Sequence, residues 1–337
     1  MNMCDIGDDD RASEAYFWAK GIMPNVETIE VASFDASFRR YLRLRTLSNE
    51  SYIVMDAPPS RESVDEFLEV AEIFESGDIR VPSIYAYDKT QGFILLEDLG
   101  QQSFFDLVSS ASSCEGRLDL YKNAIQVLFK LRKVKIGLNT LPLYDNFMLK
   151  KELLLFTEWY TPYIDVDIEV NWSALFDVIV DGVLDHPVVL VHRDFHSRNI
   201  MINCQDMVLI DFQDAVRGSA YYDLVSLLRD AYTEVDKKEE LELLKYYYDG
   251  VHSQRDSFES FFRCYQLIGL QRHLKVLGIF VRLFKRDGKS QYLSYLPRVL
   301  DYATKAVLDL FGCGAYSDAL ISYQDRQEQK LIVAVGG

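Results

Sequence analysis

The chain has 337 residues, 49% of them hydrophobic and 26% charged, a composition typical of a folded protein rather than a disordered one. The net charge of −16 at pH 7 disfavours a nucleic acid or an anionic membrane as partner, because both require a basic surface. The five cysteines form no CxxC pair, and the sequence shows neither a signal peptide nor a membrane-spanning run, so we expect a cytoplasmic protein with reduced thiols.

The first hundred residues predict a helix and five strands. Helical spacing over 11–21 ends at Gly21, and β-rich segments follow at 26–33, 37–45 and 51–57. Residues 61–77 have the apolar periodicity of an amphipathic helix. Further strands at 84–88 and 93–100 complete an expected five-stranded antiparallel sheet.

After Asp98 the composition changes and helical patterns dominate. Apolar spacing predicts helices at 103–108, 119–134, 150–164, 226–232, 237–253 and 257–288, of which the last is long enough to be one bent helix or two. The aromatic residues Trp159 and Tyr160 fit a buried helix stripe better than a sugar-stacking platform. The sequence therefore predicts an α+β protein with an N-terminal lobe over 1–98 and a mainly helical lobe over 99–337.

The densest polar chemistry lies between three short apolar runs at 188–192, 199–202 and 207–212. The first run ends at His192 and is followed by Arg193 and Asp194, Asn199 opens the second, and Asp211 lies at the end of the third. Carboxylate and amide oxygens in this arrangement suit a hard cation such as Mg²⁺, and the chain has no Cys/His set that would suit zinc.

The spacing matches the phosphoryl-transfer template of kinases. In that template Asp194 accepts the proton of the attacking hydroxyl, and Asn199 and Asp211 hold Mg²⁺. The alternative is structural, with Asp194 capping a turn and Asn199 satisfying backbone groups. Asp211 opens the string Asp-Phe-Gln rather than Asp-Phe-Gly, and a helical pattern resumes by Tyr222. This leaves no room for a peptide platform, so we expect a small-molecule substrate and no peptide substrate.

The strings HRDFHSRN (192–199), IDF (210–212) and Asp223-Leu224 resemble the aminoglycoside phosphotransferase and choline kinase family of small-molecule kinases. VHRDFHSRNIM, IDFQDAVRG, YDLVSLLRD and LQRHLKVLGIF resemble, more narrowly, the bacterial anomeric N-acetylmuramate/N-acetylglucosamine kinases of peptidoglycan recycling. The resemblance implies a two-lobed protein-kinase-like fold with ATP and Mg²⁺ as cofactors. It also implies phosphorylation of the anomeric hydroxyl of one or both sugars, with the choice of ATP or GTP left open.

The resemblance also implies supporting roles for residues of the catalytic loop and of the nucleotide site. His192 would fix the catalytic loop, His196 would shape it, and Asp223 would hydrogen-bond it from the following helix. The hinge between the lobes would run through Glu97 and Leu99, with its backbone pairing to the adenine edge. The alternative is that these residues simply end a strand.

The phosphate-binding part of the N-terminal lobe departs from the kinase pattern. No glycine-rich loop precedes the second strand, although the turn ending at Ser37 could offer backbone amides to phosphate oxygens. Met55 stands where the resemblance implies a lysine, and Glu66 falls where its helix partner would be. Arg40 or Arg43 is the expected replacement for this cation, with exposed strand arginines as the alternative.

Five polar residues are predicted to bind the acceptor substrate: Gln213, Asp214, Arg217, Arg272 and His273. The first three follow the metal ligand directly and offer partners for hydroxyl, acetamido and carboxylate groups. The other two open a basic interval over 272–285 that would attract an anionic group such as the lactyl carboxylate of N-acetylmuramate. Solvated helix charges are the alternative.

Other functions stay open from the residues alone. An aminoglycoside kinase is disfavoured by the basic interval and Arg217, whereas nothing local excludes a choline- or homoserine-type kinase. A non-catalytic nucleotide-binding scaffold is suggested by the missing lysine, but the three residues of the phosphoryl-transfer pattern argue against it.

Overall fold

The structure, a computed structural model, describes residues 9–34, 39–137, 140–251 and 257–335. Backbone contacts divide the chain into two compact units. Unit 1 is Met1–Phe104 with Asn199–Asp214, and unit 2 is Phe105–Arg198 with Ala215–Gly337. The sequence placed residues 199–214 in the second lobe, whereas these contacts assign them to unit 1. The lobe boundary predicted after residue 98 therefore stays a prediction.

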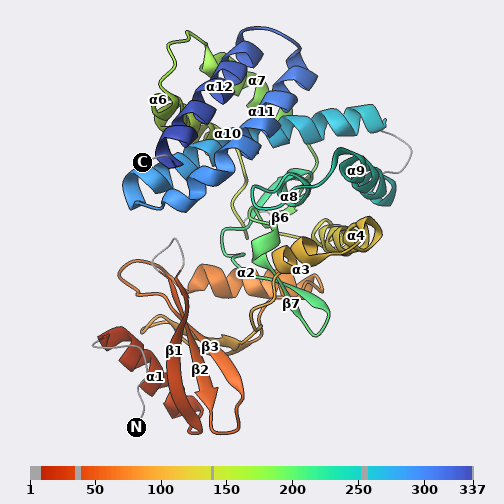
Figure 1. Cartoon of the computed structure of the whole chain (residues 1–337). Helices are drawn as coiled ribbons and strands as arrows, with labels where there is room; N and C mark the ends of the chain where they lie inside the picture. The colour runs from red at the N-terminus through yellow and green to blue at the C-terminus, as the bar shows by residue number, and fades with distance from the viewer. Residues whose placement is uncertain (1–8, 35–38, 138–139, 252–256, 336–337) are drawn as a thin grey trace. The chain divides into compact units, whose positions relative to one another are not determined.

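Unit 1 is built on an antiparallel sheet that includes β1, β2 and β3 (Figure 1). The sheet has five strands in the order β1-β2-β3-β5-β4. The strands are β1 (Val26–Phe34), β2 (Arg40–Thr46), β3 (Ser51–Asp56), β4 (Ile84–Asp88) and β5 (Phe93–Glu97). The five-stranded sheet predicted from the alternating β-rich segments is confirmed.

Alternation along β2 divides its side chains between the two faces of the sheet. Leu42 and Leu44 are buried on one face, against helix α1 (Asp10–Ile22), which contributes Ala12, Ala15, Tyr16 and Ala19 to the same core. Tyr41 and Arg43 point to the opposite face, because neighbouring side chains of a strand alternate. That face carries the cavity described below.

A hairpin of β7 (Ile200–Asn203) and β8 (Asp206–Leu209) belongs to unit 1. Its two-residue turn, Cys204 and Gln205, has φ values of 50° and 74°, as a tight hairpin turn of the right twist requires. The amide of Ile202 donates to the carbonyl of Gln102 at 2.8 Å, and the amide of Leu209 donates to the carbonyl of Arg80 at 2.9 Å. These bonds explain why the hairpin belongs with the N-terminal residues.

Helix α2 (Asp65–Ser76) packs against the end of this hairpin. The rings of Phe67 and Phe74 lie 4.6 and 5.6 Å from the ring of Phe212, measured between centroids. All three rings are buried, so the residue that follows Asp211 is fixed by apolar packing.

Unit 2 is mainly helical, as predicted. Its helices in chain order are α3 (Phe104–Ser110), α4 (Cys114–Leu131), α5 (Asn146–Leu155), η1 (Phe156–Tyr160), α6 (Thr161–Ile164), α7 (Trp172–Leu184), η2 (Ser197–Asn199, which ends in unit 1), α8 (Tyr222–Leu228), α9 (Lys237–Val251), α10 (Phe258–Asp287), η3 (Ser290–Tyr295), α11 (Leu296–Phe311) and α12 (Ala315–Val335).

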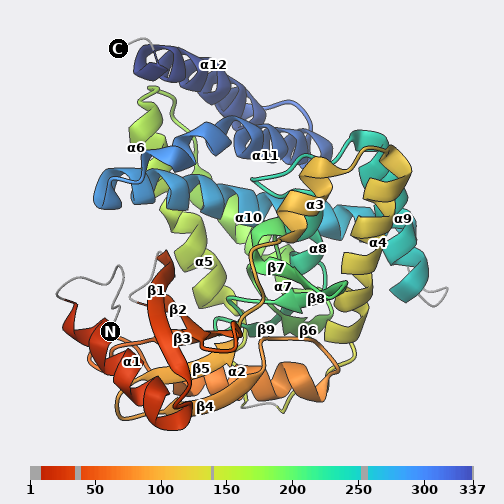
Figure 2. The same cartoon turned by 60° about the horizontal axis from the view of Figure 1, so that its bottom comes forward.

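The 30-residue helix α10 is the centre of unit 2. It packs against α5, α7, α8 and α11 (Figure 2). A side chain at Gly278 would meet the backbone of Leu155 at 2.3 Å, so a glycine is needed where α10 crosses the end of α5. None of the helices within the described ranges has the length and apolar character needed to cross a bilayer.

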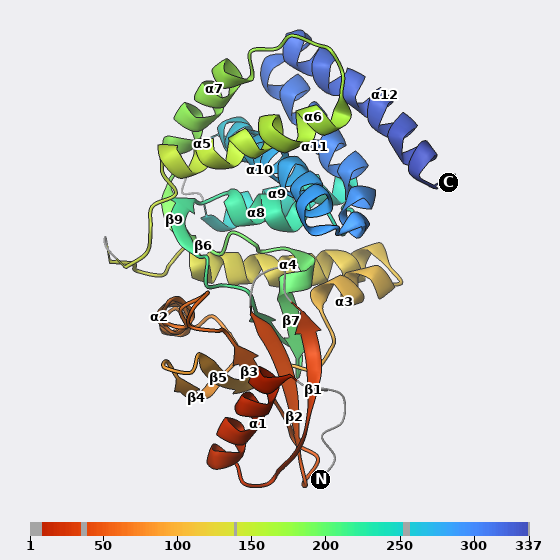
Figure 3. The ribbon, with the colours of Figure 1, turned by 90° about the vertical axis from the view of Figure 1, so that its left-hand side faces the viewer.

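Several predicted elements differ from the observed ones. The helix predicted over 150–164 is divided by the π-helical turn η1, and the helix predicted over 226–232 begins earlier, at Tyr222. The third apolar run ends as a strand at Leu209, because Asp211 has a left-handed φ of 61°. The sequence analysis did not predict α11, α12 or the short strand β9 (Val216–Ser219), which pairs with β6 (Val188–Val191) (Figure 3).

Candidate active site

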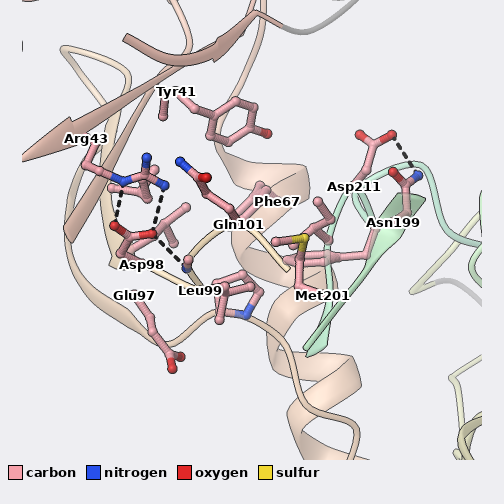
Figure 4. Close-up of a pocket in the computed structure, with 17 residues that line it drawn as sticks. Tyr41, Arg43, Phe67, Glu97, Asp98, Leu99, Gln101, Asn199, Met201 and Asp211 are labelled. Atoms are coloured by element: carbon pink, nitrogen blue, oxygen red, sulfur yellow. Dashed lines mark hydrogen bonds and ion pairs between the residues drawn. The ribbon is translucent and has the colours of Figure 1, made fainter. Parts of the chain in front are cut away.

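Unit 1 contains a cavity of about 490 Å³ on the sheet face that carries Tyr41 and Arg43 (Figure 4). Its apolar walls include Ile53, Leu96 and Met201, and its polar lining consists of Arg43, Glu97, Asp98, Gln101, Asn199 and Asp211. Figure 4 shows Asn199 and Asp211 at one end and the Glu97–Leu99 segment at the other. This size, with mostly apolar walls and a few polar groups, is typical of a small-molecule site.

The structure brings together the two predicted metal ligands. The Asn199 Nδ2 atom lies 3.4 Å from Asp211 Oδ2, and the amide of Ile210 donates to the carbonyl of Asn199 at 3.0 Å. Gln213 donates from Nε2 to the other carboxylate oxygen of Asp211 at 2.8 Å. The left-handed backbone of Asp211 is uncommon outside glycine and is often found at functional sites.

This pair fits what Mg²⁺ requires from a protein in a kinase. Mg²⁺ keeps several waters and is usually bound through one or two carboxylates together with substrate phosphates. Among the residues that the structure describes, no three His, Cys, Asp or Glu side chains form a metal-binding group. Asn199 and Asp211 would therefore hold the ion only together with a nucleotide, and their metal role stays a prediction.

Arg43 lines the cavity but is bound to a neighbouring carboxylate. Its Nε and Nη2 atoms donate to Asp98 at 2.6 and 3.1 Å, and Asp98 also accepts from the amide of Gly100 at 3.0 Å. Burial alone would raise the pKa of Asp98, but these hydrogen bonds hold it below its usual value. Arg43 therefore stabilises the segment that follows β5.

Arg40 occupies the other face of β2. Its guanidinium pairs with Asp56 at 2.7 Å and also with Asp9, next to α1, and it is absent from the cavity lining. Its predicted nucleotide contact finds no support in this placement. Met55 is fully buried opposite Tyr41, and Ser37 lies outside the described residues.

An ion pair that the sequence analysis missed joins β2 to α2. Arg39, directly before β2, pairs with Glu62, directly upstream of α2, and both side chains are largely buried. Glu66, the predicted helix partner of the missing lysine, is exposed. Arg39 directly precedes Arg40, which was predicted. Arg39 itself was not predicted, because the match of β3 to the kinase pattern placed the missing cation at Met55.

The predicted hinge residues lie at the cavity. The Glu97 carboxylate binds Arg80 at 2.7 and 2.8 Å and accepts from Asn203 Nδ2 at 3.0 Å. Its backbone amide donates to the carbonyl of Ser83 at 2.9 Å, so both groups are engaged within the protein. Leu99 lines the cavity, and its backbone amide and carbonyl make no hydrogen bond to another described residue.

The predicted catalytic loop lies in unit 2, after β6. The Asp223 carboxylate accepts from the amides of His192 at 2.7 Å and Arg193 at 3.1 Å, the kind of contact expected for it, and burial raises its pKa to about 7. The amide of Asp194 donates to Nδ1 of His192 at 3.3 Å, and Arg193 has a φ of 73°. These bonds fix the turn that presents Asp194.

The surroundings of Asp194 favour its ionised form. Burial alone would raise the pKa of this carboxyl, but the charges of Lys275 and Arg272 lower it, and the net direction is downward. A carboxylate that stays ionised at neutral pH can accept a proton from a hydroxyl.

A buried network around Glu152 supports the same loop. Glu152, on α5, binds Arg193 at 2.7 Å and Lys275 of α10 at 3.0 Å, and it accepts from Gln271 Nε2 at 3.2 Å and from the Tyr144 hydroxyl. No local pattern joins these residues, although a glutamate within the apolar stripe of α5 was a readable signal.

The predicted acceptor-binding residues are distributed over both units. Gln213, which binds Asp211, belongs to unit 1 together with Asp214. In unit 2, Arg217 donates from Nε to the carbonyl of Leu141 at 3.0 Å. Their contacts with a substrate stay predictions.

The remaining predicted residues also lie in unit 2. Arg272 is buried on α10. His273 is fully buried with its ring 5.2 Å from that of Tyr302, a placement that does not favour substrate contact. The ring of His196 lies 5.1 Å from that of Tyr232, between centroids, which fits its predicted loop-shaping role.

Residues 28–258 match the model described as the phosphotransferase enzyme family. The chain belongs to this family. It is 36% identical over 323 residues to the N-acetylmuramate/N-acetylglucosamine kinase of Pseudomonas aeruginosa, covering 90% of this chain and 94% of that protein. It is 36% identical over 293 residues to the protein of the same name from Pseudomonas putida, covering 83% and 84%. The predicted phosphotransferase class is thereby confirmed.

Solved structures of this phosphotransferase's fold agree with the predicted architecture. Plasmodium vivax ethanolamine kinase superposes with a TM-score of 0.59 at 15% identity, over 87% of this chain and 86% of that one. The ADP-bound aminoglycoside phosphotransferase APH(2'')-Ib superposes with a TM-score of 0.59 at 15% identity, over 89% and 99%. At this identity they show the fold alone, and the predicted kinase-like fold is confirmed.

Proposed function

We propose that this phosphotransferase transfers the terminal phosphoryl group of ATP to the anomeric hydroxyl of N-acetylmuramate and N-acetylglucosamine, giving the sugar 1-phosphates used in cell-wall sugar recycling. The observation that carries the proposal is the 36% identity, over nine-tenths of the chain, to an N-acetylmuramate/N-acetylglucosamine kinase. The site chemistry supports it, because few groups besides a carboxylate acceptor and metal ligands are needed for phosphoryl transfer.

The unit 1 cavity is the proposed nucleotide site. Ile53, Leu96 and Met201 would enclose the adenine, whose edge would pair with the backbone of Leu99. Asn199 and Asp211 would hold Mg²⁺, which screens phosphate charge when bound. The aminoglycoside phosphotransferase named above is an ADP-bound structure of the same fold, which agrees with a nucleotide in this family.

Two groups of this chain complete the proposed chemistry. Arg39 precedes Arg40 and therefore falls, by strand alternation, on the face of β2 that carries Tyr41 and Arg43, although like Arg40 it is not among the residues that line the cavity. Held by Glu62, it would supply the phosphate-neutralising cation in place of the lysine that Met55 replaces. Asp194 would orient the anomeric hydroxyl and accept its proton late, because the loose transition state delays proton transfer.

A substrate panel tests this proposal. The purified chain is incubated with ATP or GTP, Mg²⁺ and one acceptor from N-acetylmuramate, N-acetylglucosamine, kanamycin, choline and homoserine, and the products are followed by phosphorus NMR. We expect an anomeric phosphate with the two N-acetylated sugars and none with Asp194→Asn. Turnover only with aminoglycosides, choline or homoserine would replace this function. A lack of turnover with every acceptor would favour a scaffold.

A further inference from the structure

Arg272 is a buried cation whose hydrogen-bonding groups are not satisfied by the described protein. Its side chain, on α10, is 5% exposed. Its Nε atom is buried without a hydrogen-bond partner, and no hydrogen bond or ion pair joins its guanidinium to any described residue. Leaving a buried charged donor unpaired costs several kcal/mol, so such a group points to an anionic ligand.

The other basic residues that influence the pKa of Asp194 are either bound to other side chains or uncharged. Lys275 binds Glu152 at 3.0 Å and the Tyr222 hydroxyl at 3.1 Å. Arg193 binds the same Glu152 oxygen at 2.7 Å. Burial lowers the pKa of His196, which favours its neutral form. Within the described chain, Arg272 is thus the basic neighbour of Asp194 that can receive an anion.

The position of Arg272 connects it to the acceptor hydroxyl. Arg272 and Lys275 are three residues apart on α10 and therefore neighbours on its surface. Lys275 binds Glu152, and Glu152 also binds Arg193, the residue directly before Asp194. The charge of Arg272 also acts directly on the Asp194 carboxyl, so an anion bound by Arg272 would lie near the residue proposed to accept the proton of the reacting hydroxyl.

We propose that Arg272 binds the lactyl carboxylate of N-acetylmuramate, so that one acceptor site serves an acidic and a neutral sugar; the inference rests on the proposed function. The two sugars in the relatives' name differ by this lactyl ether, whose carboxylate matches the planar donor pair of a guanidinium. With N-acetylglucosamine, water takes the place of the carboxylate. If Arg272 instead contacted the transferred phosphoryl group, it would contribute equally to the turnover of both sugars. Comparing the two sugars therefore distinguishes a carboxylate ligand from a phosphoryl ligand.

The test compares kcat and KM for both sugars in the full-length enzyme. Arg272→Gln should lower kcat/KM for N-acetylmuramate on the order of 10- to 100-fold, mainly through KM, because hydrogen bonds between charged groups contribute that much. It should leave N-acetylglucosamine within about threefold. For Arg272→Lys, the kcat/KM for N-acetylmuramate should fall between the values of the wild-type enzyme and Arg272→Gln. Arg286→Gln removes the same charge from an exposed position of α10 and should change kcat/KM for neither sugar.

A second measurement needs no variant and holds if Arg272→Gln fails to fold. For the wild-type enzyme, kcat/KM for the methyl ester of N-acetylmuramate should be on the order of 10- to 100-fold lower than for the acid. Equal losses for both sugars, an unchanged selectivity, or equal turnover of acid and ester would each overturn the assignment. Turnover of neither sugar by the wild-type enzyme would instead remove the proposed function, and the inference with it.

Discussion

Replacing Glu152 by Gln should destabilise the protein strongly, because two buried cations depend on its charge. The Glu152 side chain is 11% exposed and binds Lys275 and Arg193. Burial alone would raise the pKa of Glu152, but these two charges lower it from 4.5 to about 2. At about 1.4 kcal/mol per pKa unit, this difference corresponds to roughly 3 kcal/mol of stability at neutral pH.

The direction of the pH dependence follows from this lowered pKa. The contribution of Glu152 is fully present above pH 4.5 and disappears as the pH falls toward 2, because the folded protein binds this proton less tightly than the unfolded chain. The difference in unfolding free energy between the wild-type protein and Glu152→Gln should therefore shrink over this interval.

Urea unfolding followed by circular dichroism measures the effect. Glu152→Gln should lose about 3 kcal/mol at pH 7. The same change at Glu242, which pairs with Lys122 at 2.8 Å and is 51% exposed, should cost less than about 1 kcal/mol. Adding Lys275→Met to Glu152→Gln should cost less than the sum of the two, because the second change removes the orphaned charge. Equal costs at Glu152 and Glu242, or strict additivity, would refute this reasoning.

Three further predictions concern the active site and the fold. Asp194→Asn should reduce turnover by several powers of ten with nearly unchanged ATP binding, whereas Asp211→Asn should lose Mg²⁺-dependent nucleotide binding measured by calorimetry; equal defects would show that the roles are misassigned. Arg39→Gln should raise the KM for ATP at least tenfold, with partial recovery in Arg39→Lys, and an unchanged KM would exclude Arg39 as the phosphate cation. Gly92→Ala should destabilise by more than 1 kcal/mol in urea unfolding, because its φ is 74° and a Cβ would lie 2.0 Å from the Ala57 carbonyl oxygen; Gly312→Ala, with a φ of 73° and open space, should cost less.

The elements that the sequence predicts correctly depend on local patterns. Alternation and turn residues define the five strands of unit 1, and the spacing of Asp194, Asn199 and Asp211 is readable because one short loop and one hairpin carry it. The sharp turn of that hairpin fixes its register, so the placement of Asn199 beside Asp211 follows from the local sequence.

The missed features depend on contacts between distant segments. Arg39 and Glu62 are separated by a strand, a turn and a second strand, and Glu152 meets Arg193 and Lys275 only after three elements have packed. The strand β9 was missed because Val216–Ser219 is too short to show a periodicity. The π-helical turn after α5 was missed because a single wider turn inside a helix leaves no recognisable local pattern in the sequence.

The hairpin that carries Asn199 and Asp211 has a consequence for synthesis and truncation. Unit 1 is completed by residues 199–214, which are made after nearly 100 residues of unit 2. On the ribosome, the carbonyls of Arg80 and Gln102 must therefore wait for the hairpin that binds them until almost two-thirds of the chain has emerged. A fragment that stops at Phe104 would lack both proposed magnesium ligands, so a shortened nucleotide-binding domain requires the hairpin to be grafted onto it.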